Sequence, residues 1–180
     1  MISVREGAEM LAMLQSMVQK IDQLSEWTGK IFIWLGLPLV LVDVYEVFSR
    51  YILNSPHMWS MNITTWLYGA HFMMLAGYTL LHKRHVSIDI FYSHCSPRKQ
   101  AWIDVITYLL FFFPFLVIII WVGSRYAAFS WKIRETTPTT QPLPVYLYKT
   151  ILPVSLVLLL LQGLSDFLKK VLFLVKGAEL

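Results

Sequence analysis

The sequence is poor in charged residues, and those that it has are unevenly distributed. Asp, Glu, Lys and Arg make up 14% of its 180 residues, against about 25% in a typical globular domain. None of the four occurs in residues 51–82 or 105–124, and residues 136–165 contain only Lys149. A bilayer core about 30 Å thick needs roughly 20 apolar residues per helix. These uncharged stretches exclude an ordinary soluble domain and indicate an integral membrane protein.

The chain also lacks the patterns of common catalytic sites. Its single cysteine, Cys95, cannot form an intrachain disulfide. No phosphate-binding glycine loop, nucleophile elbow or pair of catalytic carboxylates is found in the sequence. We therefore expect no enzymatic activity, no catalytic, substrate-binding or metal-binding residue, and no resident cofactor. Residues 2–18 lack the apolar core and cleavage site of a secretory signal, so no signal peptide is expected.

Hydrophobic residues make up 57% of the chain and form four stretches long enough to cross a membrane. We predict spans at about residues 27–48, 59–81, 102–123 and 147–167. They form a transmembrane domain over residues 27–172, followed by a tail at residues 173–180. The expected fold class is an all-α integral membrane protein with four transmembrane helices.

An amphipathic helix is predicted before the first span, over residues 1–26. Apolar residues recur there at intervals of three or four, and polar residues cover the other faces. The stripe consists of Met10, Leu14, Met17, Ile21 and Leu24, widened by Met13 and Val18. Such a helix buries its stripe on the membrane surface or against a partner, and the sequence leaves both open.

The distribution of Lys and Arg predicts the orientation. Ten of the fifteen fall in the N-terminal segment, the loop between spans two and three, and the C-terminal tail. Because basic residues are enriched in cytoplasmic loops, we expect both termini in the cytoplasm.

Three ionisable residues share one face of the first span. Asp43, Glu46 and Arg50 follow one another at i, i+3 and i+7, and Glu46 and Arg50 have the favourable order for a helical ion pair. Charges at membrane depth mark ion paths or are paired within the protein. We favour a self-neutralised stripe that faces another helix over an ion or proton path.

Histidines suggest two further sites. His71 lies in the middle of span two, but a bis-histidine haem needs a second histidine at similar depth, and the others lie at span ends or in loops. We expect a neutral His71 bonded to a neighbouring helix. After span two, His82, His85 and Asp89 would share one helical face, and His94 and Cys95 follow. Their spacing fits no closed zinc site well, so a headgroup-boundary segment is favoured.

The outer loop from Trp131 to Pro144 contains three prolines and four threonines, which predicts an extended, exposed segment. It is either a passive connector or a docking rim for a soluble partner.

Several short motifs, in order along residues 20–172, resemble the small membrane subunit (DctQ type) of tripartite ATP-independent periplasmic (TRAP) transporters. They are Arg50-Tyr51, Asn54, Trp59-Ser60, the run from His85 to Tyr92, Ser96-Pro97-Arg98, Trp102-Ile103-Asp104, Trp131, Glu135, Leu143-Pro144, Lys149 and Pro153. One departure is that many relatives carry acidic residues where this chain has Met61 and Asn62.

The resemblance implies a scaffold in the bacterial inner membrane. It would support a large multi-span subunit that carries the substrate and sodium sites, in sodium-driven uptake of an organic anion delivered by a periplasmic binding protein. Candidate subunit-interface residues are Asp43, Glu46, Arg50, Trp59 and His71, with Arg84, His85 and Asp89 on the cytoplasmic side. Candidate periplasmic docking residues are Trp131, Arg134 and Glu135. The alternatives are a membrane anchor of a quinone-linked respiratory enzyme and a small autonomous transporter.

Overall fold

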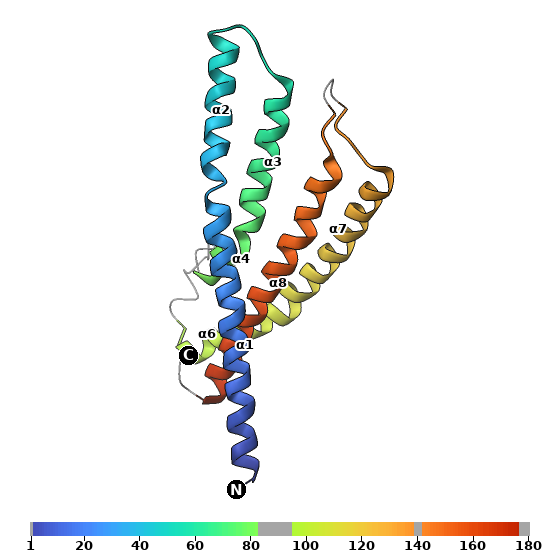
Figure 1. Cartoon of the computed structure of the whole chain (residues 1–180). Helices are drawn as coiled ribbons and strands as arrows, with labels where there is room; N and C mark the ends of the chain where they lie inside the picture. Colours follow the sequence, from blue (N-terminus) through green and yellow to red (C-terminus); the bar gives the residue numbers. More distant parts are fainter. Residues whose placement is uncertain (1, 83–94, 139–141, 177–180) are drawn as a thin grey trace.

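The computed structural model describes residues 2–82, 95–138 and 142–176, which are almost entirely helical (Figure 1). Within these ranges the extended pairing is limited to an isolated antiparallel bridge between Thr136 and Pro144. The elements are α1 (Ile2–Ile33), α2 (Gly36–Tyr51), α3 (Met58–Met74), α4 (Ala76–Leu81), α6 (Pro97–Thr107), the π-helix η1 (Tyr108–Phe112), α7 (Phe113–Ile133) and α8 (Val145–Lys176).

Helix α8 is the centre of the bundle. It packs against α1, α3, α4, α6 and α7, whereas α2 packs mainly against α3. Helices α1 and α2 follow one another almost in line, and α7 runs back beside α8 (Figure 1). We call the end where α1 begins and α8 ends the basal end, and the end with the α2–α3 and α7–α8 connections the distal end.

Three helical stretches are long and apolar enough to cross a membrane: Ala12–Tyr51, Pro97–Ile133 and Val145–Val175. They agree with three of the spans predicted from the sequence. The fourth predicted span, residues 59–81, is helical but is divided at Leu75 into α3 and α4. The all-helical class is therefore confirmed, three long apolar helices support the membrane character, and a fourth crossing stays a prediction.

The helix predicted to end at residue 26 continues without a break to Ile33, and the interruption falls inside the first predicted span, at Trp34 and Leu35. Pro38 provides the physical reason. A proline lacks the N–H that would bond the carbonyl four residues earlier, and its ring crowds that carbonyl. The carbonyl of Trp34 instead accepts from Leu37 N at 3.2 Å.

Two helix ends lie beyond the positions predicted from the sequence. Helix α7 continues to Ile133, so Trp131 belongs to its last turn and not to the connecting loop as predicted. The helix ends where Arg134 adopts a left-handed conformation (φ 48°), with Glu135 N bonded to Ser130 O at 3.1 Å. Helix α8 continues to Lys176, past the predicted end at 167.

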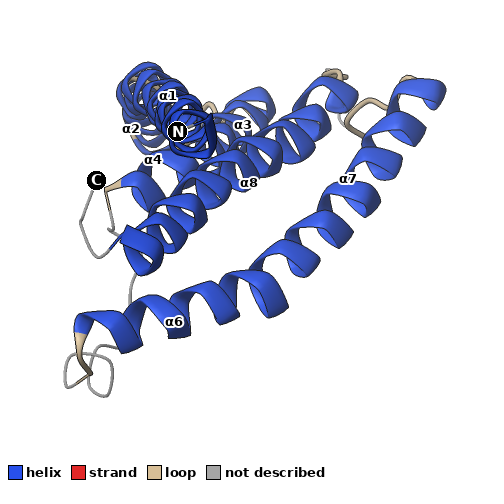
Figure 2. Ribbon diagram, turned by 90° about the horizontal axis from the view of Figure 1, so that it is seen from below, coloured by secondary structure: helices blue, strands red, loops and turns tan. Residues whose placement is uncertain are grey.

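The third span is curved (Figure 2). The five-residue π-helix η1 joins α6 to α7, and Pro114 follows directly in the first turn of α7. Proline and π-turns are common causes of helix bends. The bend places Phe112 on Gly163 of α8, where an added Cβ would lie 2.1 Å from Phe112 Cε1.

The packed surfaces of the helices are small and polar, and their large apolar residues point outward. In the part of the chain that the structure describes, the largest of the fully buried side chains are Ser49, Ser60, Ser130, Gln162 and Ser165. Small and hydroxyl side chains let helices approach closely in a membrane. Exposed large apolar residues run along α2 and α7, including Leu41, Val44, Ile118 and Trp121. This inside-out distribution is typical of a protein surrounded by lipid or by apolar partners.

Candidate functional site

The ionisable stripe predicted on the first span lies on α2, at the distal end, and Glu46 and Arg50 form an ion pair there. Arg50 Nη2 lies 2.8 Å from Glu46 Oε1. The same carboxylate accepts from the backbone N–H of His57, with Oε2 3.3 Å away. Glu46 therefore connects α2 to the residue that precedes α3.

Asp43, one turn earlier, also bonds to the neighbouring helix. Its Oδ1 accepts from Thr64 Oγ1 of α3 at 2.7 Å. The stripe thus has its partners within the chain and faces α3, as the favoured interpretation of the sequence requires. The sequence did not identify Thr64 as the partner of Asp43, because a threonine in a membrane helix carries no distinctive signal.

A polar and aromatic cluster closes the connection between α2 and α3. Ser49 is buried and donates to Ser55 O at 2.8 Å, and its Oγ lies 3.2 Å from His57 Nδ1. Trp59 is half-buried and stacks on Tyr45 with ring centroids 6.0 Å apart. These contacts hold the connection between α2 and α3, and they occupy one face of the candidate interface residue Trp59.

His71 bonds to a neighbouring helix, as the sequence predicts. Its Nδ1 lies 2.8 Å from the carbonyl oxygen of Phe32 in α1. Since a carbonyl only accepts, Nδ1 carries the proton. Gly36 lies beside the imidazole, where an added Cβ would make an ordinary contact with His71 Cε1 at 3.5 Å. The histidine therefore fixes α3 against the interruption between α1 and α2.

At the other distal connection, Glu135 is held by α7 and α8 together. Its Oε2 lies 2.5 Å from Lys149 Nζ and accepts from Ser130 Oγ at 2.6 Å. The Lys149 ammonium, followed by the Ser130 hydroxyl, holds the pKa of the Glu135 carboxyl below its ordinary value. Lys149 also lies over the ring of Tyr126, 4.0 Å from its centroid. This ion pair holds the start of α8 against the end of α7.

The remaining candidate docking residues flank the Glu135–Lys149 ion pair. Trp131 Nε1 donates to Thr150 Oγ1 of α8 at 2.8 Å, although its ring stays 48% exposed. Arg134 is exposed at the left-handed turn. The backbones of Thr137 and Leu143 pair at 3.0 Å, so the described parts of the connection form a narrow extended ribbon. Trp131 and Arg134 are the docking candidates with accessible side chains.

A buried polar cluster at the basal end was not predicted from the sequence. Asp22 of α1 accepts from Gln162 Nε2 at 3.0 Å and from Ser165 Oγ at 2.7 Å, and Lys169 Nζ lies 2.7 Å from its other oxygen. Gln162 and Ser165 have no exposed surface. Asp22 was counted as part of a polar helix face, because its partners lie 140 or more residues away in the sequence.

Two further pairs of ionisable side chains lie near this cluster. Asp104 of α6 lies 2.7 Å from Lys170 of α8, and Glu26 of α1 lies 2.9 Å from His82 at the end of α4. We call these pairs, together with Asp22 and Lys169, the basal charge belt. It connects α1, α4, α6 and α8 at one level of the bundle.

Three predicted residues, Arg84, His85 and Asp89, lie outside the described residues. Among the residues that are described, no group of three or more His, Cys, Asp or Glu side chains could hold a metal ion.

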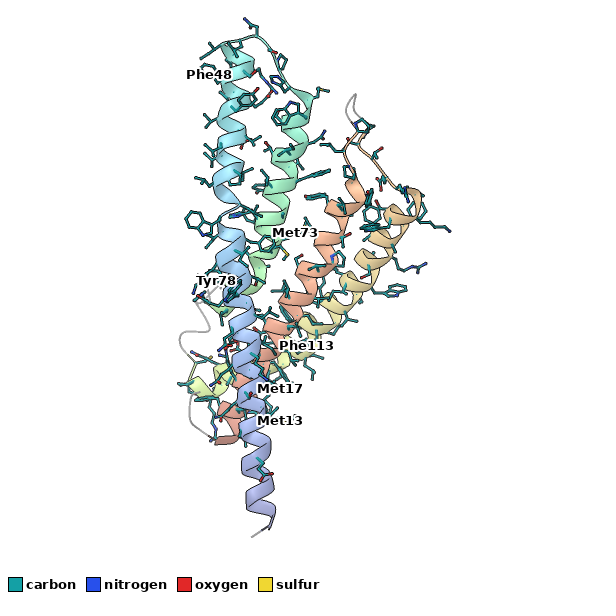
Figure 3. The ribbon with its side chains drawn as sticks, in the orientation of Figure 1. Met13, Met17, Phe48, Met73, Tyr78 and Phe113 are labelled. Carbon is teal, nitrogen blue, oxygen red and sulfur yellow. The ribbon has the colours of Figure 1, made fainter. Side chains whose placement is uncertain are left out.

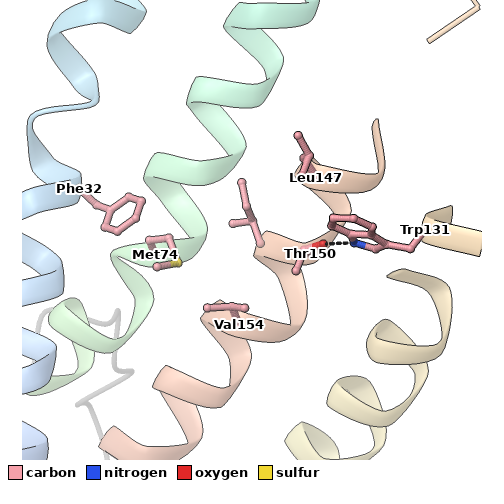
Figure 4. Close-up of a pocket in the computed structure, with 7 residues that line it drawn as sticks. Phe32, Met74, Trp131, Leu147, Thr150 and Val154 are labelled. Atoms are coloured by element: carbon pink, nitrogen blue, oxygen red, sulfur yellow. Dashed lines mark hydrogen bonds between the residues drawn. The ribbon is translucent and has the colours of Figure 1, made fainter. Parts of the chain in front are cut away.

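An apolar groove of about 250 Å³ opens between α1, α3, α7 and α8 (Figure 4). Its lining residues are Phe32, Met74, Trp131, Leu147, Thr150, Ile151 and Val154. Thr150, bonded to Trp131, contributes the one hydroxyl among them. The groove offers shape and apolar surface, and its lining carries no ionisable group that could act as an acid or a base.

Residues 39–173, three quarters of the chain, match the model of the family described as tripartite ATP-independent periplasmic transporters, DctQ component. The chain belongs to this family. The DctQ match begins in α2 and ends in α8, so α1 lies outside it. No curated protein matches the chain. Because this family is a component of transporters, the match does not support the alternative of a membrane anchor for a quinone-linked respiratory enzyme.

Proposed function

We propose that the chain is the scaffold subunit of a TRAP transporter for sodium-driven uptake of an organic anion. A large multi-span subunit carries the substrate and sodium sites, and a periplasmic binding protein delivers the substrate. The DctQ family match carries this proposal. No resident cofactor is expected on this chain.

The internal pairing of the charges supports a scaffold role. An ion path needs ionisable groups that are accessible along a route through the protein. Asp43 is exposed but bonds to Thr64, and Glu46 bonds to Arg50 and His57, all within the α2–α3 hairpin. Residues committed to holding two helices together suit a rigid support better than a moving ion site.

The proposed topology has four crossings of the bacterial inner membrane, with α3 and α4 together forming the second. The basal end faces the cytoplasm and the distal end the periplasm. The excess of Lys and Arg in segments at the basal end supports this orientation. Trp131 and Arg134 then lie where a periplasmic binding protein docks, and Glu135 holds that surface in place.

The test is reconstitution of the transporter with and without this chain. The large subunit and the binding protein are placed in proteoliposomes with an inward sodium gradient, and uptake of radiolabelled organic anions is measured. We expect uptake with the complete set and a loss of uptake when this chain is omitted. A large subunit that neither co-purifies with this chain nor needs it for uptake would contradict the proposal.

A further inference from the structure

The side of α7 that faces away from α8 carries large apolar side chains and two cations. Five residues share this side, because they follow one another at intervals of three, four, four and three positions: Ile118, Trp121, Arg125, Phe129 and Lys132. The three apolar side chains are 60%, 61% and 59% exposed in chain order, and both cations are exposed as well. In Figure 3, side chains project from α7 on the side away from α8. We call these five residues the outer face of α7.

The two cations of the outer face have no carboxylate partner in the described part of the chain. No Asp or Glu occurs in residues 105–134, and the acids on either side of this stretch are paired with lysines of α8. None of the ion pairs among the described residues includes Arg125 or Lys132. The guanidinium carbon of Arg125 instead lies over the Trp121 ring, 5.1 Å from its centre. Arg125 falls inside the candidate membrane span Pro97–Ile133, and a cation on the surface of such a span needs a counter-charge.

The side chains of the outer face favour lipid over another helix as its neighbour. Membrane helices pack through small residues, which let their backbones approach closely. The small residues of α7, Gly123, Ala127 and Ser130, are buried, and a Cβ added at Gly123 would lie 3.4 Å from Leu152 of α8. The packing face of α7 is therefore already used within the chain. The outer face has a large or long side chain at each position, which holds a second backbone at a distance but lets flexible acyl chains fill the spaces.

The order of residues along the outer face matches the layers of a phospholipid leaflet. Ile118 comes first, the Trp121 ring and the Arg125 guanidinium lie together, and Lys132 follows about 10 Å further along the helix. Tryptophan and arginine are side chains that anchor a helix at the headgroup level. A zwitterionic headgroup brings its own cation, whereas an anionic headgroup leaves the charge of its phosphate for a guanidinium.

We propose that the outer face of α7 binds an anionic phospholipid. The phosphate pairs with Arg125, Lys132 adds a second positive charge on the headgroup side, and the acyl chains cover Ile118 and Trp121. This proposal rests on the membrane character of the chain and on the unpaired cations of α7, and it does not depend on the proposed transport function.

The experiment is native mass spectrometry of the full chain, purified in detergent and titrated with phosphatidylglycerol or with zwitterionic phosphatidylcholine. The wild-type chain should bind phosphatidylglycerol more tightly. Arg125→Gln and Lys132→Gln should each lower the affinity for phosphatidylglycerol roughly fivefold, the effect of one basic side chain at an anionic lipid surface, and should leave the affinity for phosphatidylcholine unchanged. Lys30→Gln is the matched control, because it removes the same charge from an exposed side chain that is paired with Glu26.

A conservative variant separates a lost charge from a disturbed fold. Arg125→Lys keeps a cation at this position and should keep the preference for phosphatidylglycerol. The inference is overturned if the wild-type chain binds both lipids equally, or if Lys30→Gln loses as much affinity as Arg125→Gln. It is also overturned if Arg125→Gln dissociates dimers of the chain, or if Arg125→Gln and Lys132→Gln, but not Lys30→Gln, abolish co-purification with a large transporter subunit. The outer face would then contact a protein and not a lipid.

Discussion

The imidazole of His71 donates its Nδ1 proton to the backbone carbonyl of Phe32, 2.8 Å away. The bond joins α3 to α1 one residue before α1 ends, where the helix is weakened by Pro38. The His71 side chain thus stabilises the backbone where it is interrupted between α1 and α2.

Replacing His71 should therefore lower the stability of the assembled complex. His71→Leu removes the donor, and we expect a loss of about 1 kcal/mol, as is typical of hydrogen bonds between membrane helices. Thermal unfolding in detergent measures the effect. His71→Asn keeps a donor at this position and should lose less. Equal losses in the two variants would show that the bond contributes little.

Removing Arg50 alone should weaken assembly more than removing Arg50 together with the charge of Glu46. Arg50→Ala leaves Glu46 without its cation, and breaking one side of a partly buried pair destabilises more than removing both charges. Co-purification with the large subunit should fall for Arg50→Ala and recover in the Arg50→Ala, Glu46→Gln double variant.

The same stripe gives a prediction about transport. In assembled complexes, Asp43→Asn and Glu46→Gln should leave the sodium dependence of uptake unchanged, because both residues bond within the α2–α3 hairpin. Uptake across a sodium titration measures it. A changed Hill slope in either variant would move these residues from the scaffold into the ion pathway.

A glycine contact allows a packing test in α8. Gly163→Ala places a Cβ against the ring of Phe112 and should cost about 1–3 kcal/mol, the usual penalty for overpacking. Gly77→Ala is the control, because its Cβ would meet Leu158 O at 3.6 Å, an ordinary contact. Phe112→Leu should restore part of the stability lost in Gly163→Ala. Equal melting temperatures for the two alanine variants would contradict the close approach.

The pKa of Glu135 gives a pH dependence. Because Lys149, and then Ser130, lower the pKa of this carboxyl below its ordinary value of 4.5, the carboxylate stabilises the folded state fully above pH 4.5. The contribution declines as the pH falls through the lowered pKa, and it is absent below it. The melting temperatures of wild type and Glu135→Gln should differ at pH 7 and converge in acid. A difference in melting temperature that persists below that pKa would argue against a stabilising Glu135–Lys149 ion pair.

The sequence predicted the fold class and the approximate positions of the helices, but not the contacts between residues on different helices. Uncharged stretches located the helices because lipid tolerates few charges. The Glu46–Arg50 pair was predictable because both residues lie on one helix. The Asp22–Gln162 contact was not, since the two residues are 140 positions apart and only the packing of α1 on α8 brings them together.

Some helix ends likewise had a signal in the sequence, and others did not. The end of α7 depends on the left-handed turn at Arg134 and on the bond between Ser130 and Glu135, neither of which changes hydropathy. The interruption at Trp34 did have a signal in Pro38, although a proline in an apolar stretch also occurs inside continuous helices. Pro153 within α8 is such a case.

The basal charge belt has a consequence for how the chain enters the membrane. Before α8 meets α1 and α6, Lys169 and Lys170 lack their partners Asp22 and Asp104, and we propose that their positive charge then biases the orientation of α8 during insertion. Once the bundle closes, Asp22 and Asp104 neutralise the same two ammonium groups. In this proposal the two lysines act first as an orientation signal in the nascent chain and then as the ion-pair partners of Asp22 and Asp104 in the folded one.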